Sequence, residues 1–180
     1  MKIKIITLAI FQFFYCIAKS QTIQYTSQQI HSHNNYQQSI PLIDAINNKV
    51  GSIEIDILLW KDTLWVGHDL KDILNKNSLS NQYLSPLDSI IRKNNNSPYR
   101  DTNASLQILI DIKTQADVTL FKLVKELSLY NSLTQNKKID IVITGNQPDQ
   151  TTWSRYPKYI HFDGQFKHSY DQNSLERISL

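Results

Sequence analysis

Three short runs of apolar, mostly β-branched residues recur along this chain, with helical patterns between them. The runs are Ser52–Leu59, Leu106–Ile112 and Ile139–Thr144. Between the last two lies Ala116–Tyr130, in which the leucines and a valine repeat at the spacing of one helix face. Strands that alternate with helices in this way form parallel βαβ units. The sequence therefore predicts an α/β fold, and the length after residue 20 suits a single domain.

Weaker patterns complete this outline. Further strands are expected at Thr22–His33, Leu64–Gly67 and Tyr159–Asp163. Further helices are expected at Pro41–Asn48, Ser85–Ile91, Thr151–Tyr156 and Asn173–Leu180. Leu64–Gly67 is expected to form a hairpin with Ser52–Leu59. Apart from this strand, these signals indicate about five parallel strands. A closed (β/α)8 barrel of the TIM type needs eight, so we expect residues 21–180 to form an incomplete barrel domain.

The first 20 residues have the pattern of a secretory signal peptide. Lys2 and Lys4 precede a mostly apolar run, and Ala18-Lys19-Ser20 supplies small residues at a cleavage-like spacing. The run is too short to indicate a membrane span, and the bulky residues before Cys16 argue against a lipid anchor. We therefore expect a secreted or periplasmic protein whose mature chain starts at Gln21.

Removal of this segment changes the charge and the redox chemistry of the chain. The whole sequence carries 19 basic and 16 acidic residues, and the signal segment holds three of the lysines and no acid. The mature chain is therefore neutral before histidine is counted, which argues against nucleic acid or an anionic membrane as a bulk partner. Cys16 is the only cysteine, so the mature chain has neither disulfides nor thiolate metal sites.

Chemically capable side chains gather in the first half of the chain. Glu54 and Asp56 lie two apart in an expected strand, so both carboxylates point to the same face. Two acids on one face repel each other and are costly to bury without a cation. His33 and His68 lie nearby in sequence. Because imidazole titrates close to neutral pH, this set suggests a divalent ion with histidines that move protons beside it.

Asp111 and Lys113 add an acid and a base at the end of a later strand. Active sites of parallel barrels lie at the C-terminal ends of the strands, so Asp111 is expected to face the same opening as Glu54 and Asp56. Three carboxylates suit one hard cation, Mg²⁺ or Ca²⁺. Lys113 supplies a positive charge for a phosphate oxygen. An ion, a lysine and two histidines together suit the cleavage of a phosphodiester.

The order of these segments resembles the PI-PLC-like phosphodiesterase superfamily, which includes the glycerophosphodiester phosphodiesterases. Six segments carry the resemblance, in the family's order. They are Ser32–Tyr36, Ile53–Asp56, Gly67–Asp69, Leu109–Thr114, Ile143–Pro148 and Phe162–Gly164. The resemblance implies a (β/α)8-type barrel that hydrolyses a small-molecule or lipid phosphodiester, such as a glycerophosphodiester or a phospholipid head group, with one divalent cation.

The resemblance also implies roles for individual residues. The implied catalytic histidines are His33 and His68, one as acid and the other as base. The implied metal ligands are Glu54, Asp56 and Asp111. The implied phosphate- and substrate-binding residues are Lys113 and Asn34. His31 lies just outside the matching motif and inherits no role.

The chain departs from the family pattern at two points. The order of the segments is most similar to the phosphatidylinositol-specific phospholipase C/glycerophosphodiester phosphodiesterase-like branch, which usually reads His-Asn-Asp-Tyr where this chain reads His33-Asn34-Asn35-Tyr36. The difference removes a carboxylate that is suited to a hydrogen bond or a substrate contact. The sequence also ends at Leu180, about three strands before a barrel closes. An unclosed parallel sheet exposes a strand edge, which favours pairing or aggregation.

Two other interpretations are open on the residues alone. His31-x-His33 at a strand end is similar to the opening of zinc amidohydrolases, which hold zinc with imidazoles, and His161 is the best further ligand. The missing strands also fit a non-catalytic secreted remnant or binding domain. An ion held by carboxylates favours the phosphodiesterase interpretation, whereas zinc held by His31 and His33 favours the amidohydrolase.

Overall fold

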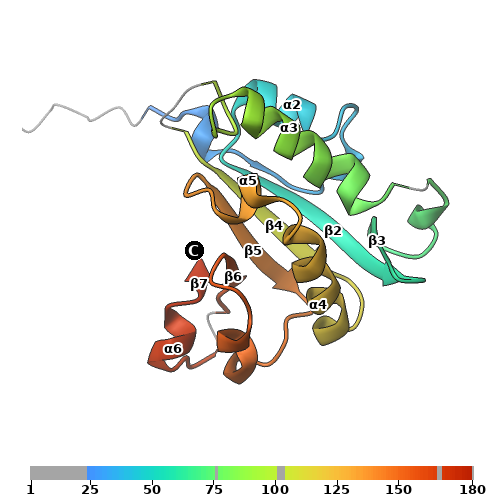
Figure 1. Cartoon of the computed structure of the whole chain (residues 1–180), viewed down its shortest axis with the longest axis vertical. Helices are drawn as coiled ribbons and strands as arrows, with labels where there is room; N and C mark the ends of the chain where they lie inside the picture. Colours follow the sequence, from blue (N-terminus) through green and yellow to red (C-terminus); the bar gives the residue numbers. More distant parts are fainter. Residues whose placement is uncertain (1–23, 76, 101–103, 166–167, 180) are drawn as a thin grey trace, which may run out of the picture.

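The computed structural model describes residues 24–75, 77–100, 104–165 and 168–179, so the predicted signal segment 1–20 lies outside the described residues. One seven-stranded sheet forms the centre of the molecule (Figure 1). Its strands are β1 (His31–Ser32), β2 (Ser52–Trp60), β3 (Thr63–Val66), β4 (Leu106–Ile112), β5 (Ile139–Gly145), β6 (Ile160–Asp163) and β7 (Ile178–Ser179). The prediction of an α/β fold is therefore confirmed.

The parallel strands lie side by side in chain order, β1-β2-β4-β5-β6-β7, and β3 returns antiparallel to β2. This arrangement makes six parallel strands within the described residues, where about five were expected. The extra strand is β7, which lies where the sequence predicted a helix from Asn173 to Leu180. The described strands form an open sheet, and a closed barrel is not shown.

The buried guanidinium of Arg177 explains why the last segment turns into a strand. Its nitrogens donate to the carbonyl oxygens of Pro157 and Ile160, at 2.8 and 2.7 Å for the shortest bonds. The Arg177 carbonyl in turn accepts from the backbone nitrogen of Phe162 on β6. The helix that was expected is reduced to the single turn of α6 (Gln172–Leu175), because these contacts pull the following residues alongside β6.

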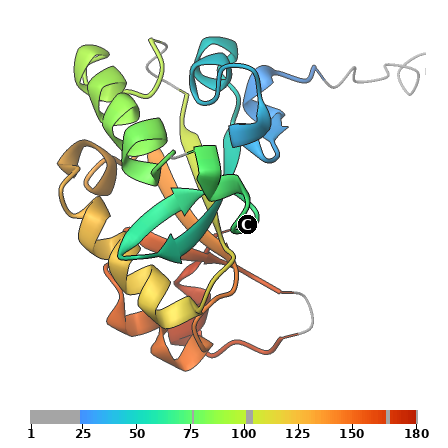
Figure 2. The same cartoon turned by 90° about the vertical axis from the view of Figure 1, so that its right-hand side faces the viewer.

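The two longer helices, α3 (Ser85–Lys93) and α4 (Ala116–Leu127), cover one side of the sheet (Figure 2). Besides α6, the other α-helices of the described residues are α2 (Ile43–Asn48) and α5 (Asn131–Thr134). Short 3₁₀ turns occur at Ser27–Gln29, Asn35–Gln37, Asp72–Asn75 and Gln150–Arg155, and a π-helical turn occurs at Ser80–Leu84. This last turn leads straight into α3, which begins at Ser85 as the sequence predicted. No helix in the described ranges is both long and apolar enough to cross a membrane.

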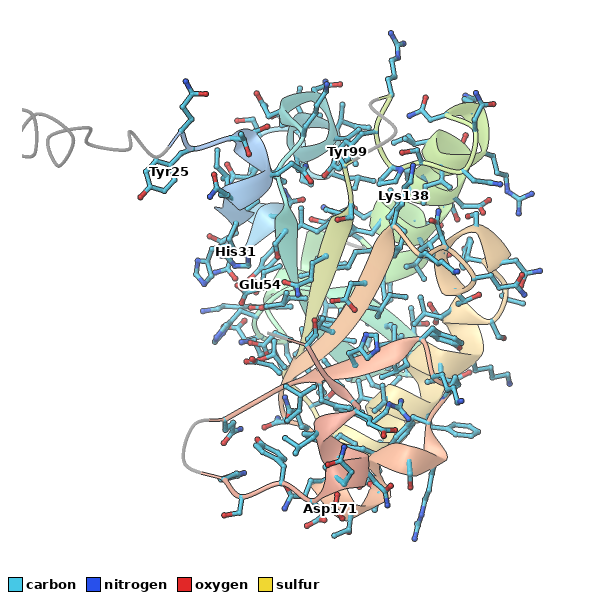
Figure 3. All side chains as sticks on the ribbon, turned by 90° about the vertical axis from the view of Figure 1, so that its left-hand side faces the viewer. Tyr25, His31, Glu54, Tyr99, Lys138 and Asp171 are labelled. Carbon is cyan, nitrogen blue, oxygen red and sulfur yellow. The ribbon has the colours of Figure 1, made fainter. Side chains whose placement is uncertain are left out.

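Alternation along the strands gives the sheet two unlike faces. One face is apolar and packs against α3, α4 and the preceding turn. This layer comprises Ile53, Ile55, Leu79, Tyr83, Leu84, Leu87, Ile108, Ile110, Leu127 and Ile141. The other face carries the alternate, mostly polar side chains. Figure 3 views the molecule from this polar side, with His31 and Glu54 next to each other at the edge of the sheet.

The sheet is curled towards its polar face. Gln107 on β4 donates from Nε2 to Asp140 on β5 and to Ser179 on β7, both at 3.3 Å. Two strands separate β4 from β7 in the sheet, so this contact requires the far edge to bend back over the polar side chains. The curl concentrates the polar residues of several strands in one concave region.

Candidate functional site

Three carboxylates converge on the polar face where β2 and β4 lie side by side. Asp56 and Asp111 occupy directly opposed positions of the two parallel strands, and Glu54 lies two residues earlier on the same face. One oxygen of each carboxylate lies within 4.8 Å of the other two. The sequence predicted that these three acids would share one opening, and the structure brings them together.

Two oxygens of this acidic cluster have no hydrogen-bond partner within the part of the chain that the structure describes. They are Oδ1 of Asp56 and Oδ1 of Asp111, and both atoms are buried. Burial raises the pKa of Asp56, against the lowering effects of Tyr36 and Lys113, while Asp111 adds to the increase. A buried, unpaired carboxylate oxygen is costly. The donor set therefore fits a hard divalent cation, which takes oxygen ligands.

The other oxygens of the two aspartates are held by neighbouring side chains. Tyr36 donates from its hydroxyl to Asp56 Oδ2 at 2.9 Å. Lys113 Nζ lies 2.9 Å from Asp111 Oδ2 and 3.5 Å from Asp56 Oδ2. Partial burial alone would lower the pKa of Lys113, but its hydrogen bond to Asp111 and the attraction of both acids raise it overall. The lysine therefore stays charged beside the acids.

His31 in β1 and His33 just after it both lie beside Glu54. His31 Nε2 is 3.0 Å from Glu54 Oε2, and its Nδ1 is 3.0 Å from Ser52 Oγ. His33 Nε2 lies 3.8 Å from the same Glu54 oxygen, and its side chain is 70% exposed. The structure thus places His33 at the rim of the acidic cluster. It also gives His31 a contact that the sequence had not assigned to it.

His68 follows the return strand of the hairpin. The backbone nitrogen of Gly67 donates to the Asp56 carbonyl oxygen at 3.0 Å, which ties the start of the His68 loop to the acidic strand. Asp72 Oδ2 accepts from the backbone nitrogens of His68 and Asp69. Gly67 has φ 151°, and a Cβ atom there would lie 2.5 Å from that of Asp72. The loop therefore needs glycine at this point, and it presents His68 with an exposed side chain.

The two asparagines after His33 have different environments. Asn34 adopts a left-handed conformation with φ 46°, which asparagine tolerates better than most residues. Asn35 is 1% exposed. Its Oδ1 accepts from Leu42 N and from the hydroxyl of Tyr83, and its Nδ2 donates to Ser32 Oγ. Asn35 is therefore part of the core that supports β1, and its polar atoms bond to Ser32, Leu42 and Tyr83 and not to the acidic cluster.

Gly145, at the end of β5, borders the acidic cluster on its other side. A Cβ atom there would lie 1.9 Å from Asp111 Oδ1, and the residue has φ 71°. A pocket of about 380 Å³ starts at Gly145 and extends over the loops after β5 and β6. Its lining is Gly145, Asn146, Gln147, Pro148, Asp149, Gln150, Trp153, Gln165, His168 and Tyr170. The pocket and the acidic cluster therefore meet at Gly145, which lines the pocket and lies against Asp111.

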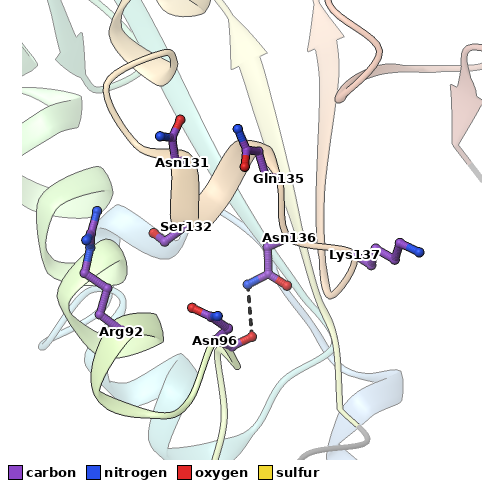
Figure 4. A pocket seen from close by; sticks show the side chains of 7 residues that line it. All are labelled: Arg92, Asn96, Asn131, Ser132, Gln135, Asn136 and Lys137. Carbon is purple, nitrogen blue, oxygen red and sulfur yellow. Dashed lines mark hydrogen bonds between the residues drawn. The ribbon is translucent and has the colours of Figure 1, made fainter.

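A second pocket lies elsewhere. It is formed by the end of α3, the loop after it and α5, and Asn136 donates to the Asn96 carbonyl oxygen across it (Figure 4). It contains none of the predicted site residues. We therefore regard the acidic cluster, with its buried unpaired oxygens, as the candidate site.

The amidohydrolase interpretation gains no support from the arrangement of ligands. Among the described residues, the group of three or more candidate ligands close enough to share an ion consists of three carboxylates. His161, the further zinc ligand that it required, has its Nδ1 2.6 Å from Asp140 Oδ1. Both ring nitrogens of His31 already lie within hydrogen-bonding distance of side chains.

Sequence reasoning missed three residues that shape the site: His31, Tyr36 and Gly145. His31 lies two residues before His33 at an expected strand end, so the sequence could have indicated that both side chains point to the same face. Its partner, however, follows from the pairing of β1 with β2, which sequence does not give. Tyr36 belonged to a motif that was noted but was assigned no role. Gly145 belongs to the Ile143–Pro148 segment of the resemblance, which implied no role for it.

Comparison with known proteins identifies a phosphodiesterase-like family. A family model described as an AIM6-like phosphodiesterase domain matches residues 19–163. The chain is 28% identical over 167 residues to an altered inheritance of mitochondria protein 6 homolog of Arthroderma benhamiae, covering 77% of this chain and 53% of that protein. It is 30% identical over 158 residues to altered inheritance of mitochondria protein 6 of Kluyveromyces lactis, covering 66% and 38%.

The chain therefore spans about half of the first relative and less of the second. No solved structure matches it significantly. The family match contains β1 to β6, all three acids and both histidines of the predicted site. By this match, which covers most of its length, the chain belongs to the family of AIM6-like phosphodiesterase domains.

Proposed function

We propose that this domain is a cation-dependent phosphodiesterase that acts on a glycerophosphodiester or a phospholipid head group. The observation that carries the proposal is the convergence of Glu54, Asp56 and Asp111, in which Asp56 and Asp111 each keep one buried, unpaired oxygen. The family match supports phosphodiester chemistry. We also propose that the site binds a metal ion and that the chain is a member of the PI-PLC-like superfamily.

Glu54, Asp56 and Asp111 would hold the ion. Their oxygens suit Mg²⁺ or Ca²⁺, which prefer carboxylates over imidazoles. When bound, such an ion neutralises the negative charge of the phosphate and draws electron density from phosphorus. Lys113 adds a second positive charge beside the same acids, where a phosphate oxygen would lie next to it.

His33 and His68 are proposed as the proton-transfer pair. His33 lies at the rim beside Glu54, and His68 starts from the backbone that bonds to Asp56. One imidazole takes the proton of an adjacent substrate hydroxyl as its oxygen bonds to phosphorus. The other gives its proton to the alcohol oxygen as the bond from that oxygen to phosphorus breaks. A cyclic phosphate and a free alcohol result, and imidazoles suit both steps at neutral pH.

The pocket that starts at Gly145 is the proposed place for the part of the substrate beyond the phosphate. It starts at Gly145, which lies against Asp111, and is lined mostly by amide and aromatic side chains. Asn34 lies after His33 on the opposite side of the acids and is proposed to contact the substrate there. The chain order of the parallel strands and the curl of the sheet also support a barrel wall, so we propose a (β/α)8-type architecture for the whole domain.

The test is hydrolysis of glycerophosphodiesters by the purified chain, with Mg²⁺, Ca²⁺ or a chelator. Cation-dependent release of the alcohol, lost in His68→Ala and in Asp111→Asn, supports the proposal. His161→Ala is the matched control, because this histidine pairs with Asp140 and has no role in the proposed reaction. A folded chain that binds cation but hydrolyses none of these diesters overturns the enzymatic proposal and favours the non-catalytic binding domain.

The hydrolysis assay does not test whether the protein is exported from the cell. The secreted or periplasmic location rests on residues 1–20 and stays a prediction. Expression of the natural gene with its first 20 residues, followed by N-terminal sequencing of the exported protein, tests it. A mature protein that starts at Gln21 supports export, and retention of Met1 overturns it.

A further inference from the structure

Each acid of the cluster has one oxygen held by a neighbouring side chain. Glu54 Oε2 lies 3.0 Å from His31 Nε2. Asp56 Oδ2 accepts from Tyr36 at 2.9 Å, and Asp111 Oδ2 pairs with Lys113 at 2.9 Å. On both aspartates the second oxygen is buried without a partner. The held oxygen fixes the rotation of each carboxylate, and the second oxygen of each aspartate has no partner in the described part of the chain.

His31 is held at both ring nitrogens and so cannot turn freely. Its Nδ1 lies 3.0 Å from Ser52 Oγ, and Ser52 in turn donates to Gln107 Oε1 on β4. Because an ionised carboxylate only accepts hydrogen bonds, Nε2 is the donor in the contact with Glu54. The His31 side chain is 41% exposed, so it contributes little to the core. Its contacts are those of a residue that orients another side chain.

Tyr36 has the same relation to Asp56. Its ring packs against the core, and its hydroxyl reaches the aspartate from the turn that follows β1. Asp56 itself is 1% exposed, so this bond forms where water competes little. Both positioning groups therefore come from one short segment, His31–Tyr36, which wraps the acids from the β1 edge.

We propose that His31 and Tyr36 are positioning residues that fix Glu54 and Asp56 in the geometry of a small, rigid cation site. The inference rests on the proposed function, because it assumes that the three acids hold a cation. It assigns to His31 a role different from proton transfer, which stays with His33 and His68. It also gives the site a preference, since Mg²⁺ demands near-ideal octahedral geometry whereas Ca²⁺ tolerates a flexible one.

The experiment measures the dissociation constants of Mg²⁺ and Ca²⁺ for the purified chain by titration calorimetry. His31→Leu and Tyr36→Phe remove the two donors. We expect each to weaken Mg²⁺ binding by about 10- to 100-fold, as is usual when an outer partner of a ligand is lost. The loss for Ca²⁺ should be smaller, so the Mg²⁺/Ca²⁺ preference falls. A merely structural role would weaken both ions alike.

Two matched variants complete the design. His31→Gln keeps an amide donor at about the distance of Nε2 and should restore most of the Mg²⁺ affinity. Tyr130→Phe removes a tyrosine hydroxyl that bonds to Ser80 and Ser85 on the helical side, and it should leave both affinities unchanged. Wild-type affinity for Mg²⁺ in His31→Leu and Tyr36→Phe overturns the inference. A wild-type chain that binds neither ion overturns the proposed function instead.

Discussion

The polar face of the sheet holds two groups of acids, and they differ in how their oxygens are used. Asp140, on β5, is fully paired. Its Oδ1 lies 2.6 Å from His161 Nδ1, and its Oδ2 accepts from Ser179 at 2.5 Å and from Gln107 at 3.3 Å. These partners come from β4, β6 and β7, so Asp140 joins four strands. The cluster at Glu54, Asp56 and Asp111 instead leaves two buried oxygens unpaired.

The contrast distinguishes an acid that stabilises the sheet, Asp140, from acids whose unpaired oxygens are suited to bind a cation. A fully paired carboxylate repays its burial with hydrogen bonds, and its removal leaves the partners unpaired. A buried carboxylate with an unpaired oxygen destabilises the chain until a cation completes it. The two groups share one concave face and one class of residue, so charge alone does not distinguish them. The number of partners of each oxygen does.

The largest expected effect is on cation binding. Asp111→Asn removes one of three proposed ligands and should weaken Mg²⁺ binding by more than about 100-fold, since loss of an outer partner alone costs 10- to 100-fold. Asp140→Asn should leave the affinity unchanged, because its oxygens already have protein partners. Calorimetric titration of both variants measures the difference. Equal affinities in the two variants would break the comparison between the groups.

The second prediction concerns the sign of a stability change. In the presence of a chelator, Asp140→Asn should lower the free energy of unfolding by about 1 to 3 kcal/mol, because charge-assisted hydrogen bonds are lost. The same substitution at Asp56 should raise it by about 1 kcal/mol, because the burial cost of an ionised group is removed. Urea unfolding at neutral pH measures both. Destabilisation of similar size by both substitutions contradicts the distinction.

Much of the acidic cluster could be predicted from sequence because it follows from local periodicity. Glu54 and Asp56 alternate along one strand, and Asp111 ends another, so parallel pairing was enough to bring them together. The fold class followed from the same runs. The unpaired oxygens were not predictable, because they depend on which side chains of other segments reach each carboxylate.

Long-range pairing explains the rest of what sequence could not give. His31 meets Glu54 only because β1 aligns His31 with Ser52. Asp140 meets His161 across two strands that are separate in sequence. The strand at Ile178–Ser179 was mistaken for a helix, because a two-residue strand has no periodicity and its position depends on the buried Arg177.

The third prediction uses backbone geometry to alter one acid without changing its charge. Gly145→Ala places a methyl group against Asp111 Oδ1 at a residue with φ 71°, so the carboxylate must move. We expect about a tenfold loss of Mg²⁺ affinity, equivalent to about 1.4 kcal/mol, and a modest loss of stability. Gly164→Ala is the control, because its added methyl group meets only the Ile178 side chain. Unchanged Mg²⁺ affinity in Gly145→Ala would show that the Asp111 oxygen need not be free.

The smallest expected effect is on the free energy of unfolding, and it measures what burial of a carboxylate costs outside the acidic cluster. Glu126, on α4, is a carboxylate away from both groups. Burial raises its pKa above the usual range, although Lys122 opposes the shift. The folded chain therefore binds this proton more tightly than the unfolded chain, and the stability contributed is lost as the pH rises through the raised pKa. At neutral pH, Glu126→Gln should stabilise the protein by about 0.5 kcal/mol or less.

This gain should disappear at about pH 4, where the glutamate is largely protonated in both states. Urea unfolding at the two pH values, with the exposed Glu176→Gln as the control, measures it. The result gives the cost of partial burial for a carboxylate outside any site. If Glu126→Gln gains as much stability as Asp56→Asn, then burial alone explains the behaviour of Asp56. A clearly larger gain at Asp56 means that the clustering of unpaired oxygens adds its own destabilisation, as expected for acids arranged around a cation.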